Sequence, residues 1–133
     1  MKTNSFVLPL SIFSAALVFA CSSARDVEVT GEVTAAVGTT PAKIHVEFFD
    51  MAGDGDTLQK TSIQAIDLGA PGSFKETVPV EGDKLLVRAI ADDDGDGKCT
   101  AGEAWAEQQL SVKADGTVEA AKLQLALQDC PAS

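Results

Sequence analysis

Tyrosine is absent from this chain, and tryptophan and histidine occur once each among its 133 residues. Because no motif places a serine or cysteine beside the single His45, nucleophilic catalysis has no visible base. The chain also lacks a phosphate loop and a glycine-rich dinucleotide fingerprint, and its few aromatic residues offer little for a sugar cleft. We therefore expect the protein not to be an enzyme.

Positive charge is scarce as well. Ten Lys and Arg residues stand against 20 Asp and Glu residues, which gives a formal net charge of −10. Such a chain repels phosphate backbones, so a nucleic-acid partner is excluded. At 45% hydrophobic residues, the composition is too apolar for a disordered acidic tail, and the length suits one folded domain.

One long apolar run lies at the N-terminus. Lys2 precedes the uncharged segment Phe6 to Phe19, and the small residue Ala20 follows it, which is the layout of a secretory signal peptide. As a helix this run would span about 21 Å, short of the ~30 Å hydrocarbon core of a membrane. The organisation that we predict is a signal peptide at 1–20, a tether at 21–25 and a single domain at 26–133.

The end of this run resembles a bacterial lipobox, in the residues Val18-Phe19-Ala20-Cys21. The resemblance implies that the signal peptide is cut before Cys21 and that Cys21 carries the lipid that anchors the protein to a membrane. Ser22 is the next residue, and in Gram-negative lipoproteins a residue other than Asp there implies the outer membrane. The alternative is ordinary cleavage nearby, for example after Ala24, which would give a periplasmic or secreted protein.

The three cysteines, an odd number, fit this reading. If Cys21 is lipidated, Cys99 and Cys130 remain and can form a disulfide in an oxidising compartment. Such a bridge closes a loop of about 30 residues, which the chain-entropy model values at roughly 3.5 kcal/mol. Two free buried thiols are the alternative.

Alternating apolar and polar residues, with turn signals between them, predict seven short strands. They cover residues 26–34, 43–49, 59–67, 73–80, 84–91, 104–112 and 117–127. Residues 38–41 read as a turn, and 81–83 and 114–116 read as hairpin turns. The last segment does not keep one parity, which allows a bulge near Ala121 or a short helix. The pattern predicts an all-β fold, an antiparallel Ig-like or transthyretin-like β-sandwich.

Residues 69–103 are similar to the transthyretin-like and collagen-adhesin B-type sandwich domains. A strand with a Phe, Gly72-Ser-Phe, leads through a short turn into the strand Lys84-Leu-Leu-Val-Arg-Ala and then into a polar loop. This resemblance implies a fold more than an activity.

The acidic loop at 92–103, DDDGDGKCTAGE, matches the calcium-loop pattern D-x-[DN]-x-[DN]-G-x₅-E when counted from Asp92. Calcium takes six to eight oxygen ligands, and alternate side chains of a curled loop converge on one point. The predicted ligands are the side chains of Asp92, Asp94 and Asp96, the carbonyl of Lys98, Thr100 directly or through water, and both oxygens of Glu103.

This loop resembles the ion-binding loop of the EF-hand family. A strand-like segment precedes it and no amphipathic helix follows, so only the loop is carried over. The alternatives are another metal or an acidic loop without an ion, although in that case four Asp residues within five positions would repel one another. Asp50, Asp54 and Asp56 are candidates for a second, weaker site, or else belong to a polar turn.

The sequence predicts a surface position for His45 and a place in the core beneath the loop for Trp105. The function that we expect is a lipid-anchored cell-envelope protein with a structural Ca²⁺ loop, acting as a binding or scaffolding module for an unknown protein or glycan partner. The rival is a calcium-dependent adhesin or carbohydrate-binding module, which would need an open coordination position on the ion. No motif supports a third class, a small envelope enzyme or inhibitor.

Overall fold

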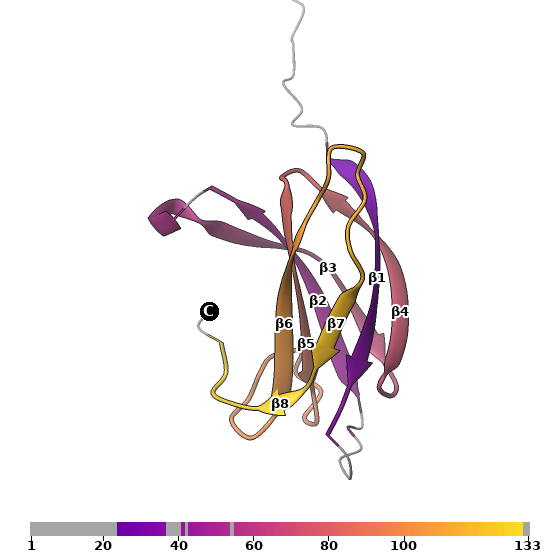
Figure 1. The fold of residues 1–133 in the computed structure, drawn as a ribbon. Helices are drawn as coiled ribbons and strands as arrows, with labels where there is room; N and C mark the ends of the chain where they lie inside the picture. The colour runs from indigo at the N-terminus through magenta and orange to yellow at the C-terminus, as the bar shows by residue number, and fades with distance from the viewer. Residues whose placement is uncertain (1–23, 37–40, 42, 54, 132–133) are drawn as a thin grey trace, which may run out of the picture.

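Two packed β-sheets form the fold of the described residues (Figure 1). The computed structural model describes residues 24–36, 41, 43–53 and 55–131. The elements are β1 (Arg25–Thr34), β2 (Ile44–Ala52), η1 (Gly55–Thr57), β3 (Gln59–Leu68), β4 (Gly72–Val80), β5 (Lys84–Ala91), β6 (Ala104–Ser111), β7 (Ala121–Gln124) and β8 (Ala126–Leu127). The predicted signal peptide, Cys21 and most of the predicted turn at 38–41 lie outside the described residues.

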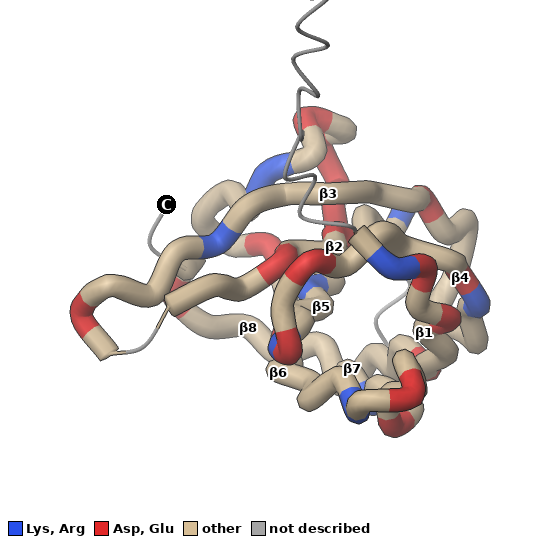
Figure 2. Tube along the Cα trace, turned by 90° about the horizontal axis from the view of Figure 1, so that it is seen from above, with Lys and Arg blue, Asp and Glu red and all other residues tan. Residues whose placement is uncertain are grey.

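The smaller sheet has the strand order β4-β1-β7, and the larger one has the order β3-β2-β5-β6-β8. Neighbouring strands are antiparallel except for β1 and β7, which are parallel. Figure 2 looks along the sandwich and shows acidic positions on both layers. The predicted all-β sandwich is confirmed, with one parallel pair that the sequence did not predict.

The core lies between the two sheets and follows from the period-two pattern of the strands. On β1 the residues Val27, Val29 and Val33 point inward, while their neighbours are exposed. Phe48 of β2 meets Phe74 of β4 edge to face, with ring centroids 6.0 Å apart. Burying each aliphatic or phenyl side chain contributes about 1.5–3 kcal/mol, so this layer holds the two sheets together.

Both hairpins predicted in the second half of the chain are wrong. The turn at 81–83 connects β4 of one sheet to β5 of the other, so it is a crossover between layers. Strands β6 and β7 also belong to different sheets. The predicted strand 117–127 divides at Leu125, which is buried and donates its N–H to Thr34 O, and the chain passes there from one sheet to the other. Alternation predicts which face a strand buries, but it does not identify the partner strand.

A substitution at Gly31 of β1 tests how tightly the two sheets are packed. A Cβ at this position would overlap the ring of Phe74, coming within 2.6 Å of its Cε1 and 3.0 Å of Ala121 Cβ. Since Phe74 is itself held against Phe48, Gly31→Ala is expected to lower the free energy of unfolding by about 1–3 kcal/mol. Denaturant unfolding measures this change. Gly72→Ala, which meets nothing within 4 Å, is the matched control and should change stability little.

Candidate metal centre

The acidic loop at 92–103 joins β5 to β6 at the end of the sandwich that lies opposite the start of β1 (Figure 1). Ile90 pairs with Trp105 next to the loop, whereas Lys84 pairs with Ser111 at the other end of the same two strands. The guanidinium of Arg25, at the start of β1, reaches the carbonyl of Ala114 at that other end. The start of β1 and the acidic loop therefore lie at opposite ends of the domain.

Four carboxylates of the loop converge on one point. Each of Asp92, Asp94, Asp96 and Glu103 offers an oxygen, and these oxygens all lie within 4.8 Å of one another. Asp92 and Glu103 are buried, whereas Asp94 and Asp96 are exposed. The structure thus brings together all four predicted carboxylate ligands, in a cluster that could hold a metal ion.

Asp92 gives the clearest indication that the cluster could hold a cation. Its side chain is only 1% exposed, and its Oδ2 accepts a hydrogen bond from the N–H of Gly97 at 2.8 Å. Its Oδ1 is buried and has no hydrogen-bond partner. A buried polar atom without a partner costs about 1–3 kcal/mol, and more when it is charged. A cation at the centre of the cluster would satisfy this oxygen.

Backbone amides of the loop orient the carboxylate that closes it. The N–H of Thr100 donates to Glu103 Oε1 at 2.7 Å, and the N–H of Asp93 donates to Glu103 Oε2 at 2.7 Å. Glu103 is therefore held across the loop by both of its oxygens before any ion binds. The side chain of Asp93 is exposed and does not belong to the cluster.

The hydroxyl of Thr100 lies between the two exposed carboxylates. Its Oγ1 is 2.9 Å from Asp94 Oδ2 and 3.4 Å from Asp96 Oδ2. The hydrogen bond from Thr100 is the main cause that lowers the pKa of Asp94 below its ordinary value. Asp94 therefore stays ionised to lower pH, as an ion ligand must. Direct ligation by Thr100, and by the carbonyl of Lys98, stays a prediction.

Two glycines let the loop curl. Gly95 and Gly97 both have φ of +72°, in the left-handed region that side chains other than glycine rarely adopt. Gly97 occupies the glycine position of the calcium-loop pattern, and its positive φ allows the sharp turn there. A Cβ there would also come within 3.7 Å of the ring of His45, so the loop packs against β2 at this point.

The predicted disulfide is present between Cys99 of the loop and Cys130, with sulfur atoms 2.10 Å apart. It joins the loop to the C-terminal segment 128–131. This segment is also fastened to Trp105, whose Nε1–H donates to Asp129 O at 2.9 Å and whose carbonyl accepts from Gln128 Nε2 at 3.0 Å. The disulfide that ties this segment to the loop was predicted, whereas its hydrogen bonds to Trp105 were not.

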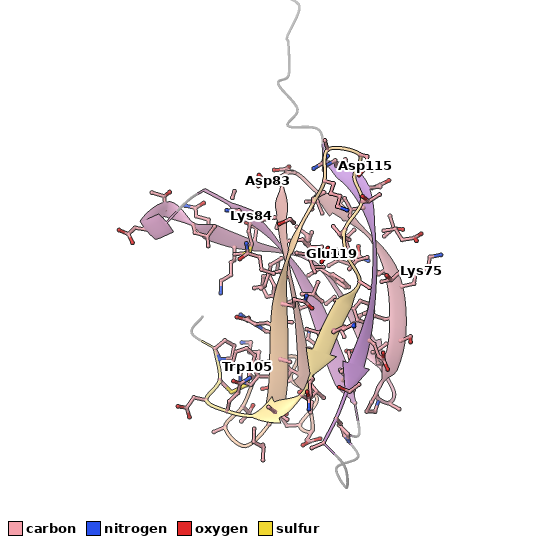
Figure 3. The ribbon with its side chains drawn as sticks, viewed as in Figure 1. Lys75, Asp83, Lys84, Trp105, Asp115 and Glu119 are labelled. Carbon is pink, nitrogen blue, oxygen red and sulfur yellow. A yellow bond between two sulfur atoms is a disulfide. The ribbon has the colours of Figure 1, made fainter. Side chains whose placement is uncertain are left out.

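Trp105 is buried, as predicted, but not between the two sheets. Trp105 lies on the outer face of the larger sheet, toward the C-terminal segment (Figure 3), and outside the cluster of core residues. The guanidinium carbon of Arg88 lies 5.0 Å from the ring centroid of Phe49 and 5.8 Å from that of Trp105, and Arg88 donates twice to Glu107 Oε2. With its ring covered in this way, Trp105 is not an open platform for a sugar.

Asp50 does not serve the second ion site considered from the sequence. It is buried, and its carboxylate accepts hydrogen bonds from the N–H groups of Glu81 and Gly82 at 2.9 and 3.3 Å. It therefore stabilises the crossover between β4 and β5. Asp56 is exposed in η1, and Asp54 lies outside the described residues.

His45 lies on the outer face of β2, as predicted, but it is more enclosed than a surface histidine. Its side chain is 16% exposed, and its Nδ1 lies 2.9 Å from Asp67 Oδ1. Lys43 also reaches Asp67, at 3.4 Å. The hydrogen bond with His45 is the main cause that lowers the pKa of Asp67, and this pair supports the strands beside the acidic loop.

Comparisons with protein-family models, with curated proteins and with solved structures find no match to this chain. Among the described residues, no helix is long and apolar enough to span a membrane.

Proposed function

We propose that this protein is a lipid-anchored component of a bacterial cell envelope whose β-sandwich carries a structural Ca²⁺ site in the loop 92–103. The domain acts as a binding or scaffolding module for a protein or glycan of the envelope. Calcium supplies the positive charge that the converging carboxylates require, and the chain supplies the oxygens and their orientation.

The buried, unpartnered Oδ1 of Asp92 carries the proposal. In a loop without an ion, this oxygen would have no reason to be excluded from water and pointed into a cluster of three other carboxylates. Calcium fits better than magnesium because it accepts more ligands in a less regular arrangement, which suits a loop of alternating side chains.

A structural role for the ion is favoured over the rival adhesin role. Two of the four carboxylates are buried, and the amides of Asp93 and Thr100 already hold the closing carboxylate in place. An ion that bridges to an external glycan needs a coordination position that the protein leaves open, and the predicted ligand set already supplies oxygens in the number that calcium takes.

Isothermal titration with CaCl₂ and with MgCl₂ tests the site. We expect the protein to bind one calcium ion with a Kd of about 10⁻⁴–10⁻³ M, as extracellular calcium modules do, and magnesium more weakly. Asp92→Asn keeps the shape of the side chain and removes its charge, so it should abolish the heat of binding. Asp93→Asn makes the same change at an exposed position outside the cluster and should retain binding. If both variants lose calcium binding equally, calcium binds only to a diffuse acidic patch and the proposed site is wrong.

Membrane attachment through Cys21 is tested separately. Cys21→Ser removes the only atom to which the lipid can be attached, so the variant should leave the membrane fraction or accumulate as an unprocessed precursor. Fractionation followed by immunoblotting and mass determination measures this. Ser22→Ala is the matched control, because it changes the neighbouring residue and keeps the thiol. A Cys21→Ser protein with the mass and location of the wild type would refute the anchor.

The start of β1 and the acidic loop lie at opposite ends of the domain, and this determines how the anchored protein would be oriented at a membrane. The domain begins with β1, at the end where Arg25 contacts Ala114, and the acidic loop lies at the other end. An eight-residue strand such as β5 spans about 27 Å. Anchored at Cys21, the domain would carry the calcium loop well away from the lipid surface.

A further inference from the structure

Cys99 lies between two residues of the acidic loop whose backbone amides hold two of the clustered carboxylates. On one side of it, the N–H of Lys98 donates to Asp96 Oδ1 at 2.8 Å. On the other side, the N–H of Thr100 donates to Glu103 Oε1 at 2.7 Å. Any movement of the backbone at Cys99 therefore displaces two of the four carboxylates of the cluster.

The partner cysteine lies in a segment that is itself fastened beside the loop. Residues 128–131 follow β8 and make no strand pairing of their own, but Gln128 and Asp129 both hydrogen bond to Trp105. Trp105 is only two residues beyond Glu103. The disulfide thus ties the middle of the loop to the segment 128–131, which is fastened near the end of the loop. The two ends of the loop are held by β5 and β6.

This arrangement changes the cost of binding a cation. Four carboxylates with oxygens within 4.8 Å repel one another when no ion is present, and a loop held only at its termini is free to spread them apart. The disulfide limits that spreading, so less conformational freedom is lost when an ion enters. Cleaving the bond releases Cys99, and with it the amides that orient Asp96 and Glu103.

We propose that the Cys99–Cys130 disulfide sets the calcium affinity of the loop, and that bound calcium in turn protects the disulfide from reduction. This inference rests on the calcium site proposed above and adds its regulation by redox state. Binding equilibria are reciprocal, so the factor by which the disulfide strengthens calcium binding equals the factor by which calcium strengthens the disulfide. We expect a factor of about ten, which for a two-electron couple corresponds to a shift of about 30 mV in the disulfide potential.

The reaction that opens the site is thiol–disulfide exchange with reduced glutathione as the experimental reductant. Two glutathione thiols deliver two electrons and two protons. The Cys99–Cys130 bond breaks, each protein sulfur becomes a thiol, and the two glutathione sulfurs join as oxidised glutathione.

Two measurements on the protein purified after export test the coupling. Calcium titration compares the oxidised wild type with the double variant Cys99→Ser/Cys130→Ser, whose Kd should be about tenfold higher. The wild type is also titrated in glutathione buffers, and its disulfide is followed by alkylation and mass spectrometry. The ratio of squared reduced to oxidised glutathione at which half of the protein is reduced should be about tenfold higher in saturating calcium than in chelator. Asp92→Asn should show no such shift, whereas Asp93→Asn should retain it.

The outcomes separate the coupling from the site. If the oxidised wild type binds calcium and both the Kd of the double variant and the redox midpoint stay unchanged, the coupling is wrong and the calcium site stands. If the oxidised wild type binds no calcium, the proposed calcium site is wrong, and the coupling that rests on it is wrong as well. If the double variant does not fold, the redox titration of the wild type decides alone, and a midpoint that calcium does not move overturns the proposal.

Discussion

Calcium is expected to raise the melting temperature of this protein by about 4–8 °C. With free calcium at about ten times the dissociation constant, an ion that binds only the folded state adds RT ln 11, roughly 1.4 kcal/mol, to the free energy of unfolding. For a domain of about 110 residues this corresponds to the stated shift. Calorimetric melting at several calcium concentrations and in excess chelator measures it, and the shift should grow with the logarithm of the concentration above the dissociation constant.

Two substitutions should abolish this shift, and a third should not. Asp92→Ala removes the buried oxygen that lacks a partner, and Glu103→Ala removes the carboxylate that closes the loop. Asp93→Ala removes the same charge from a side chain that is exposed and outside the cluster, so most of the shift should survive. Each variant is compared with itself in chelator, which separates the loss of the ion from any change in the folded chain. A shift of wild-type size in Asp92→Ala would contradict the site.

The protein without calcium should remain folded, because the core does not depend on the loop. The buried core residues come from six of the eight strands, and the acidic cluster lies at one end, beyond Ala91. A cooperative melt in chelator is therefore expected, in contrast to small domains that unfold when they lose their metal.

Removing the disulfide should have the largest effect on stability. Cys99 and Cys130 are 31 residues apart, and a loop of this size is worth about 3.5 kcal/mol in the chain-entropy model. The double variant Cys99→Ser/Cys130→Ser should lose about that much free energy of unfolding and melt on the order of 15 °C lower. Typical domains are stable by only about 5–15 kcal/mol, so this is a large share of the total.

Chemical denaturation in excess chelator measures this loss without any contribution from bound calcium. The matched control is the wild type treated with reductant and alkylated, which breaks the same bond without changing the sequence. Both should unfold at a similar denaturant concentration. A loss below about 1 kcal/mol in both would mean that the disulfide restrains the unfolded chain far less than its loop length predicts.

The local features of this protein could be predicted from its sequence, and so could the disulfide, because only two cysteines remain once Cys21 is set aside, but the strand pairings that join distant segments could not. The acidic cluster was predicted because its four residues all lie within twelve positions, at a spacing that curls the chain around one point. The burial of Val27 and Val29 followed from alternation along one strand. The pairing of β1 with β7 was missed because nothing in either strand identifies the other as its neighbour.

The environment of Trp105 was missed for the same reason. Trp105 shares its face of β6 with the exposed Glu107 and Gln109, so alternation alone does not predict its burial, which depends on residues 128–131 that carry no strand pattern. Strand β5 offered one signal that could have been used: it is apolar at nearly every position, as expected for a strand covered on both faces. Arg88 interrupts this run because Glu107 and two aromatic rings receive its guanidinium on the outer face.

The central place of β1 in its sheet has a mechanical consequence. β1 is the first strand of the described residues, and it is hydrogen bonded on both sides, over nine residue pairs to β4 and four to β7. In the anchored protein proposed above, a pull on the anchor that is resisted at the far end of the domain would run along the axis of β1. It loads these rows of hydrogen bonds together, in shear, instead of opening them one after another. A domain tied by such a strand resists tension best in the direction in which an anchored protein would be pulled.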